Sequence, residues 1–153
     1  MLVNGEDETK KFAQRVVKIV KKNPILICLN GPLGSGKTTF SRYFIRSYFS
    51  NAIKTEIPSP TFTLMQIYEH LGNSVYHYDF YRLNSPDELV ELNFEENLLD
   101  GVSLVEWADK FENVLPHNRI EITFNIKIKN KRKIDIKFLG AAKNLNKWEI
   151  GRM

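Results

Sequence analysis

Apolar residues recur at helical spacing in two segments of the chain. Residues 6–22 place Phe12 and Val20 on one face, with acidic residues at the start and lysines at the end, as the helix dipole favours. This pattern predicts a helix over 6–22 that stops at Pro24. Residues 37–49 carry aromatic side chains at the same spacing and predict a second helix.

Continuous apolar runs and alternating segments predict the strands. The runs at 25–29 and 102–107 indicate strands that are buried on both faces of a sheet. Residues 61–69 and 74–80 are predicted to form strands on either side of a turn. Together with the two helices, these runs indicate a chain in which helices and strands alternate.

The rest of the chain extends this pattern. Ser85-Pro86-Asp87-Glu88 is a strong helix start, so residues 86–99 are expected to be helical, with a break near Asn93. Apolar and polar residues alternate over 120–128 and 134–138, which predicts an antiparallel hairpin with one buried face. We therefore expect an α/β fold with a mostly parallel central sheet, flanked by helices and extended by antiparallel strands that include the C-terminal β-hairpin.

Length and composition favour a single domain. The chain has 153 residues, 42% apolar and 26% charged, which excludes a disordered or low-complexity protein. We expect one domain over 1–153, in which 141–150 form a short helix or a tail. No apolar run approaches the roughly 20 residues of a membrane span, and the N-terminus lacks a signal peptide, so we expect a cytoplasmic protein without membrane contact. The single cysteine, Cys28, excludes an internal disulfide and a cysteine-based zinc cluster.

The net charge of +4 is unevenly distributed along the chain. Residues 1–118 hold 12 basic and 15 acidic side chains, whereas residues 119–153 hold 10 basic and 3 acidic ones. The basic hairpin and tail allow three interpretations: a solvated face, a source of a cation for a nucleotide, or a surface for a nucleic acid or an acidic protein.

One motif carries strong chemical information. Residues 31–38, Gly-Pro-Leu-Gly-Ser-Gly-Lys-Thr, match the phosphate-binding pattern G-x-x-x-x-G-K-[ST] in full. The motif follows a predicted buried strand and opens a predicted helix, which is the context expected of a phosphate-binding loop. Its glycines let successive N–H groups point at anionic oxygens. Lys37 can reach the β- and γ-phosphates of a nucleotide, and the Thr38 hydroxyl can bind Mg²⁺.

A phosphate-binding loop of this kind works with a carboxylate that lies near the bound Mg²⁺ ion. Asp79 and Glu106 each end a predicted strand, where ligands bind in open α/β sheets. The residues alone leave open which carboxylate serves the metal and which the attacking water. His77, in a predicted strand, fits a hydrogen-bonded core histidine better than a ligand. Trp107, directly after Glu106, fits an ordinary core residue.

Several short motifs together make the chain resemble the TsaE family. After the phosphate-binding loop come Ser59-Pro60-Thr61-Phe62, then His77-Tyr78-Asp79-Phe80-Tyr81-Arg82-Leu83, then Glu106-Trp107. TsaE is the small ATPase of bacterial tRNA threonylcarbamoyladenosine synthesis, which modifies the adenosine beside the anticodon. The resemblance covers about residues 6–139 and implies a P-loop NTPase-like fold.

The resemblance implies roles for residues at the catalytic centre. Lys37 and Thr38 would bind the phosphates of ATP and Mg²⁺, and Glu106 would be the second protein ligand of Mg²⁺. Asp79 would be the acidic catalytic residue that orients water or the ligands of the metal, and His77 of the same motif would support it. Thr61 would be a switch-like residue near the γ-phosphate.

The same resemblance places further residues around ATP. Glu6 would lie near the nucleotide from the start of the first helix, and Trp107 would lie beside it. Arg132, chosen among three consecutive basic residues of the hairpin, would supply a cation. The other contacts would come from the loop and the first turn of its helix: Leu33, Gly34, Ser35, Gly36 and Thr39.

The resemblance also implies a reaction and partners. The chain would hydrolyse Mg·ATP, weakly alone and faster with TsaB and TsaD, of which TsaD transfers threonylcarbamoyl to adenosine. The basic hairpin would be the surface for any contact with tRNA. Two alternatives remain open. A small P-loop kinase would need an arginine-rich lid, whereas residues 83–118 hold a single basic residue, Lys110. A nucleotide-dependent adaptor would bind ATP without essential hydrolysis.

Overall fold

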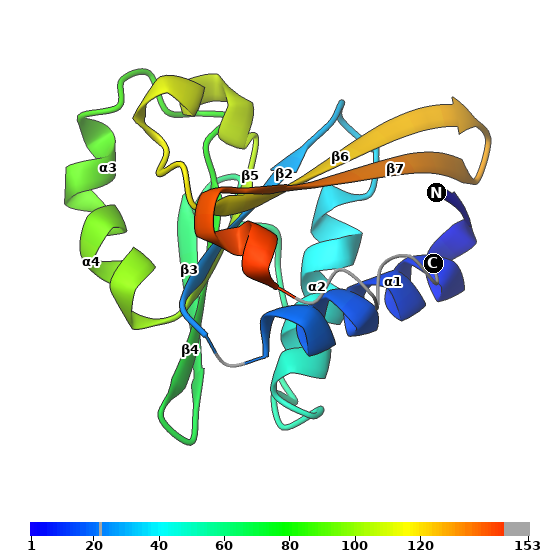
Figure 1. Cartoon of the computed structure of the whole chain (residues 1–153), viewed down its shortest axis with the longest axis horizontal. Helices are drawn as coiled ribbons and strands as arrows, with labels where there is room; N and C mark the ends of the chain where they lie inside the picture. The colour runs from blue at the N-terminus through cyan, green and yellow to red at the C-terminus, as the bar shows by residue number, and fades with distance from the viewer. Residues whose placement is uncertain (22, 146–153) are drawn as a thin grey trace.

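The computed structural model of the chain is built on one seven-stranded sheet (Figure 1). It describes residues 1–21 and 23–145. The strands are β1 (Leu2–Asn4), β2 (Ile25–Asn30), β3 (Met65–His70), β4 (Asn73–Asp79), β5 (Val102–Glu106), β6 (Arg119–Ile128) and β7 (Lys131–Leu139). The helices are α1 (Gly5–Val20), α2 (Lys37–Tyr48), α3 (Glu88–Glu91) and α4 (Phe94–Asp100), with two 3-10 helices, η1 (Ala108–Val114) and η2 (Gly140–Asn144).

Four parallel strands form the centre of the sheet. The strand order is β1-β7-β6-β2-β5-β4-β3, and β6, β2, β5 and β4 run parallel to one another. β7 and β1 extend one edge by antiparallel pairing, and β3 extends the other. The predicted α/β fold, with its mostly parallel central sheet and C-terminal β-hairpin, is confirmed.

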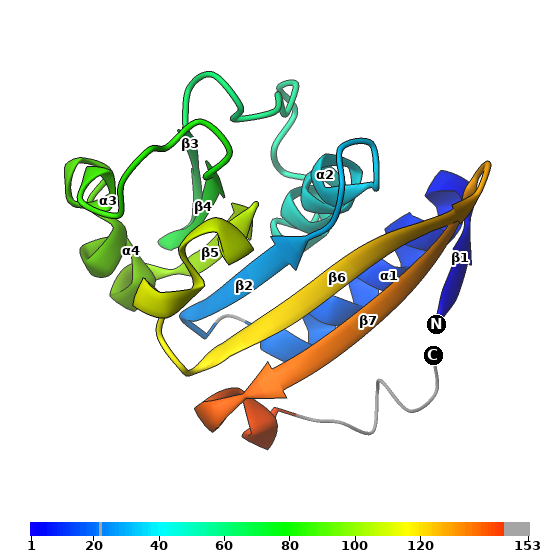
Figure 2. The ribbon, with the colours of Figure 1, turned by 90° about the horizontal axis from the view of Figure 1, so that it is seen from above.

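Apolar layers cover both faces of the sheet. Alternate residues of β2 divide between them: Ile27 and Leu29 join the cluster that contains α1 and α2, whereas Leu26 and Cys28 join the cluster that contains residues of α3, α4 and η1. Figure 2 shows the same division, with α1 and α2 on one side of the sheet and α3 and α4 on the other. The prediction that 25–29 is buried on both faces is therefore confirmed.

Aromatic side chains hold α2 against the sheet. Phe40 of α2 packs against Phe12 of α1, Phe44 of its own helix and Phe124 of β6, with ring centres 5.4, 6.0 and 5.8 Å away. All four side chains are almost completely buried. Burial of a ring of this size contributes about 1.5–3 kcal/mol of stability. The helix that follows the phosphate-binding loop is thus firmly attached to the core.

At two places a strand boundary differs from the prediction because of a residue with positive φ. The strand expected over 61–69 begins at Met65, because residues 61–63 form a turn and Leu64 has a φ of 68°. The strand expected over 102–107 ends one residue early, because Trp107 has a φ of 59° and leaves the sheet. Left-handed backbone at a non-glycine residue ends regular pairing.

Other elements also depart from the sequence pattern. The helix expected over 86–99 is broken at Asn93, as predicted, but its first part begins at Glu88. The short β1, which the sequence did not indicate, pairs with β7. The described part of the C-terminal segment forms η2, and residues 146–153 lie outside the described part of the chain. Within the described residues, no helix has the length and apolar character to cross a membrane.

Candidate nucleotide-binding site

The phosphate-binding motif forms the turn between β2 and α2. Lys37 is the first residue of α2, and Gly36 precedes it with a φ of 109°. Gly31 and Gly34 also have positive φ, at 146° and 75°, which favours glycine. A Cβ atom on Gly31 would lie 2.5 Å from the carbonyl oxygen of Phe124. The loop therefore lies directly against β6, and Gly31 has no room for a side chain.

Lys37 is held inside the loop. Its Nζ donates hydrogen bonds to the carbonyl oxygens of Gly31, at 2.6 Å, and Pro32, at 3.0 Å. The same atom lies 4.1 Å from the centre of the Trp107 ring. Burial lowers the pKa of Lys37, and the nearby carboxylates, Glu106 foremost, oppose that shift. The ammonium group is thus kept at the loop, where it can reach a bound phosphate.

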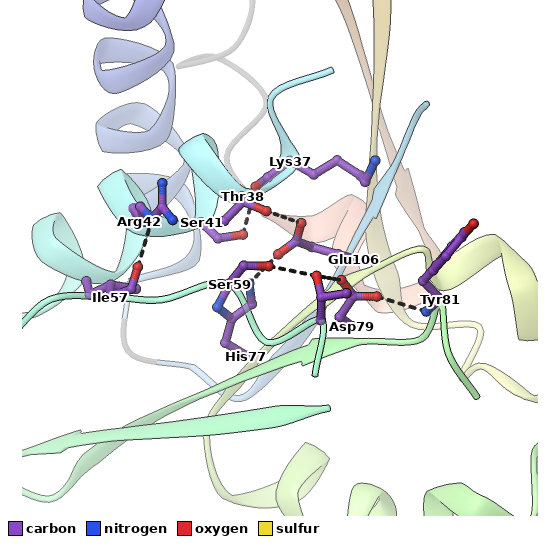
Figure 3. Close-up of polar contacts among 11 residues, drawn as sticks. Lys37, Thr38, Ser41, Arg42, Ile57, Ser59, His77, Asp79, Tyr81 and Glu106 are labelled. Atoms are coloured by element: carbon purple, nitrogen blue, oxygen red, sulfur yellow. Dashed lines mark hydrogen bonds and ion pairs between the residues drawn. The ribbon is translucent and has the colours of Figure 1, made fainter. Parts of the chain in front are cut away.

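Glu106 joins α2 to β4 through both of its carboxylate oxygens (Figure 3). Thr38 Oγ1 donates to Oε1 at 2.6 Å, and Oε2 lies 2.6 Å from His77 Nε2. Glu106 is 2% exposed and His77 is fully buried. His77 is thus a hydrogen-bonded core histidine, as predicted, but its hydrogen bond is with Glu106 and not with Asp79, which the family motif had suggested. The reason is the parallel pairing of β4 with β5, which sets Glu106 beside Asp79 and within reach of the His77 ring.

Asp79 ends β4 next to Glu106. Thr61 Oγ1 donates to Asp79 Oδ2 at 3.0 Å, and the backbone N–H of Tyr81 donates to Oδ1 at 2.8 Å. Ser59 Oγ and Thr61 Oγ1 lie 2.8 Å apart. Burial raises the pKa of Asp79, whereas the hydrogen bonds from Tyr81 and Thr61 act to lower it. Thr61, expected as the switch-like residue, and Asp79, expected as the acidic catalytic residue, are therefore in direct contact.

Arg132 reaches the loop from β7. Its Nε and Nη2 donate to the carbonyl oxygens of Ser35 and Gly34, each at 3.2 Å. Its neighbours Lys131 and Lys133 are exposed, whereas Arg132 is partly buried against the loop. Of the three consecutive basic residues, Arg132 is the one that the cavity of this site includes.

A cavity of about 390 Å³ gathers these residues at the carboxyl ends of the central strands. Glu6 lies on its wall and accepts a hydrogen bond from the Tyr43 hydroxyl at 2.9 Å. Every residue that the sequence suggested for the site lines this cavity: Glu6, Leu33, Gly34, Ser35, Gly36, Lys37, Thr38, Thr39, Thr61, Asp79, Glu106, Trp107 and Arg132.

The cavity also includes residues that the sequence did not single out. Phe124 and Ile134 of the hairpin line it, as does Asn130 at the turn between their strands. Their alternation in the sequence indicated only buried positions and a turn. No local signal could have placed them here, because the order of strands in the sheet brings the hairpin to the loop.

The side chains at this site suit a nucleotide with Mg²⁺. In the part of the chain that the structure describes, no group of three or more His, Cys, Asp or Glu side chains could hold a metal by itself. A hydroxyl and a carboxylate, from Thr38 and Glu106, are nevertheless adjacent, and Mg²⁺ prefers few protein oxygens supplemented by phosphate and water. Ser35 Oγ is buried without a hydrogen-bond partner among the described residues, inside a loop whose N–H groups can face an anion.

Fold and site together define a P-loop nucleotide-binding protein. The model of the family described as Threonylcarbamoyl adenosine biosynthesis protein TsaE matches residues 3–134, and the chain belongs to this TsaE family. The match includes the loop, both carboxylates and Arg132.

Individual proteins support this membership. The protein named tRNA threonylcarbamoyladenosine biosynthesis protein TsaE from Rickettsia typhi is 43% identical over 135 residues, which cover 88% of this chain and 92% of that protein. The protein of the same name from Bacillus subtilis is 35% identical over 151 residues, which cover 98% and 91%. The crystal structure of Bacillus subtilis YdiB has a TM-score of 0.70 and 30% identity, and the match covers 92% of this chain and 84% of that one.

Proposed function

We propose that this chain is an ATPase required for the threonylcarbamoyladenosine modification of tRNA. It hydrolyses ATP to ADP and phosphate by in-line attack of water on the γ-phosphate. The observation that carries the proposal is the convergence of Lys37, Thr38, Asp79 and Glu106 on one cavity beside a P-loop. Family membership supports the pathway, because similar proteins are named for threonylcarbamoyladenosine biosynthesis.

The loop binds the triphosphate in this proposal. Backbone N–H groups of 33–38 and the N-terminal end of α2 face the phosphate oxygens. When ATP binds, Lys37 releases its hydrogen bonds to the carbonyl oxygens of Gly31 and Pro32 and donates to the β- and γ-phosphates instead. Arg132 adds a second cation beside the loop. The remaining contacts with the nucleotide come from the cavity wall: Glu6, Leu33, Thr39 and Trp107.

Thr38 and Glu106 hold Mg²⁺ in this proposal. Their oxygens are already adjacent, so the protein supplies two ligands without rearranging the strand or the helix. The bound ion supplies charge neutralisation at the β- and γ-phosphates.

Asp79 orients the attacking water by accepting its hydrogen bond. Because burial raises its pKa, the carboxylate accepts a proton more readily than an exposed aspartate does. Thr61 donates a hydrogen bond to Asp79, and when ATP binds it gives up this bond and contacts the γ-phosphate instead. The 59–61 loop would then change its arrangement with the state of the nucleotide.

The proposed partners are TsaB and TsaD, in the cytoplasm. Hydrolysis resets their complex between catalytic cycles and does not drive the transfer of threonylcarbamoyl itself. The basic hairpin offers lysines to this complex or to its tRNA, since contacts with phosphate need positive charge and little sequence pattern.

Steady-state ATP hydrolysis with and without TsaB and TsaD tests the proposal. The wild-type chain should turn over slowly alone and faster with the pair, and Lys37→Ala should reduce the rate roughly 100- to 1,000-fold. The proposal would be contradicted if TsaB and TsaD did not stimulate ATP hydrolysis and a Lys37→Ala strain still modified its tRNA normally. Transfer of labelled γ-phosphate to an acceptor other than water would indicate a kinase. Normal modification with Asp79→Asn would indicate an adaptor.

A further inference from the structure

His77 is a polar residue in the middle of β4, where an apolar side chain would be expected. It pairs with Leu104 of β5 on one side and Gln66 of β3 on the other. The ring is fully buried, and its Nδ1 has no hydrogen-bond partner among the described residues. A buried ring nitrogen without a partner costs stability. Stability of the sheet therefore does not by itself explain a histidine at this position.

The other ring nitrogen makes one short contact. His77 Nε2 lies 2.6 Å from Glu106 Oε2, and because a carboxylate only accepts, the ring donates its Nε2–H. Thr38 donates to the second oxygen, Oε1, also at 2.6 Å. Each oxygen of Glu106 is thus engaged by one side chain, from two different elements of the fold (Figure 3).

Two further charges act at Glu106. The carboxylate is the foremost charge acting on Lys37, whose ammonium group is itself bonded to the carbonyl oxygens of Gly31 and Pro32. Asp79, beside Glu106 in the strand pairing, repels the same carboxylate. Without a donor at Oε2, the hydrogen bond from Thr38 would be left to orient the Glu106 carboxylate among the contacts of the described residues. The hydrogen bond from His77 fixes the second oxygen and so opposes rotation of the carboxylate.

We propose that His77 is a positioning residue that holds the Glu106 carboxylate against Thr38 and thereby sets the affinity of the nucleotide site for Mg²⁺. The inference rests on the proposed function, because it assumes that Thr38 and Glu106 hold this ion. Groups that orient a metal ligand by hydrogen bonding typically change metal affinity 10- to 100-fold when they are removed.

Two substitutions of similar size and polarity separate this role from packing. His77→Gln keeps a donor near the position of Nε2, whereas the shorter His77→Asn places its donor near Nδ1 and cannot reach Glu106. The measurement is the binding of a non-hydrolysable ATP analogue by calorimetry, at increasing Mg²⁺ concentration and separately in EDTA. His77→Asn should need a roughly 10- to 100-fold higher Mg²⁺ concentration to reach half of the full gain in affinity for the analogue. His77→Gln should resemble the wild type. Binding in EDTA should be the same for all three.

The outcomes distinguish the inference from the proposed function. If the wild type responds to Mg²⁺ and His77→Asn responds identically, the inference is overturned and the proposed function stands. If His77→Asn lost the same affinity for the analogue in EDTA as in Mg²⁺, the role of His77 would be purely structural, and the inference would also be overturned. If binding to the wild type does not depend on Mg²⁺ at all, the metal site of the proposed function fails, and this inference fails with it.

A measurement on the wild type covers the case in which His77→Asn does not fold. The chain has three histidines, and the other two, His70 and His117, are exposed, so the buried ring can be assigned by nitrogen NMR. The inference requires the Nε2–H tautomer of His77 and a shift of its signal when the ATP analogue and Mg²⁺ are added together. An Nδ1–H tautomer, or a signal that Mg²⁺ leaves unchanged, would overturn it.

Discussion

The ammonium group of Lys37 lies over the ring of Trp107, 4.1 Å from its centre. Trp107 directly follows Glu106 and has a φ of 59°, so the chain turns out of β5 at this residue. Tyr81 also packs against the Trp107 ring, with ring centres 5.0 Å apart. The aromatic pair therefore forms part of the wall that confines the lysine of the phosphate-binding loop.

The contact between Lys37 and Trp107 should stabilise the protein measurably. In urea unfolding, Lys37→Met, Trp107→Leu and the double variant should reveal a coupling of about 1 kcal/mol in the free energy of unfolding, because a partly desolvated cation interacts with the ring face. Lys110→Met combined with Trp107→Leu is the control, since Lys110 lies 5.9 Å from the Tyr81 ring instead. Additive effects in the first cycle would contradict the cation–π interpretation.

Replacement of Asp79 should separate binding from hydrolysis. Asp79→Asn should lower the partner-stimulated rate about 100- to 10,000-fold, because the acceptor for the attacking water is lost, and should leave the affinity for an ATP analogue largely unchanged. The variant should also be more stable at neutral pH. Burial raises the pKa of Asp79 above its ordinary value of 3.8. At neutral pH the ionised carboxylate therefore destabilises the folded state, and asparagine removes this cost.

The control for Asp79 is Asp109→Asn. Asp109 is exposed and lies outside the cavity, yet its charge acts on Lys37 as that of Asp79 does. Its replacement should leave hydrolysis nearly intact. Equal rates in Asp79→Asn and Asp109→Asn would show that loss of charge alone, and not the position of Asp79, explains the effect.

The lysines of the hairpin should act on partners and not on ATP. Lys129, Lys131 and Lys133 are exposed, and none lines the cavity. Replacing all three by Gln should weaken binding to TsaB and TsaD, most strongly at low salt, because exposed charges are screened by ions. Affinity of the isolated chain for ATP should not change.

A matched control for the hairpin lies on α1, where Lys10, Lys11 and Lys18 are equally exposed. Their replacement by Gln removes the same charge from another surface and should weaken the complex less. If neither triple variant altered the complex, the hairpin would be a solvated face.

Cys28 should be inert in the folded protein and should make stability sensitive to high pH. Burial raises the pKa of its thiol from 9.0 to about 12. Its contribution to stability is therefore fully present below pH 9.0 and is lost as the pH rises towards 12. Relative to Cys28→Ala, the wild type should lose about 2 kcal/mol of unfolding free energy between pH 8 and pH 10.5. Rapid reaction of the native protein with a thiol reagent at pH 8 would contradict the burial of this side chain.

Local patterns predicted the elements that carry the chemistry. The buried run at β2, the loop and α2 form one contiguous stretch, and each was predicted from residues that lie next to one another. The break at Asn93 was also predictable from its neighbours. Elements with little local signal were missed: β1 is three residues long and exists because β7 offers it an edge to pair with.

The partners of the site residues were less predictable. The suggested support of Asp79 by His77 came from the family motif that contains both residues, two positions apart on one strand. The actual partner, Glu106, is 29 residues away and reaches His77 because β4 and β5 run parallel in a fixed register. Residues two apart on a strand share a face, but the closest side chain is often on the adjacent strand.

By itself, the sequence determined that a phosphate-binding loop lies between a buried strand and a helix, since eight consecutive residues encode its turn, its N–H groups and its lysine. Only the tertiary structure decided what surrounds that loop. Thr38 meets Glu106 across 68 residues, and Arg132 meets Ser35 across 97. Such contacts follow from the strand order β7-β6-β2-β5-β4, which is set by the burial of apolar faces over the whole sheet and leaves no signature in any short stretch of sequence.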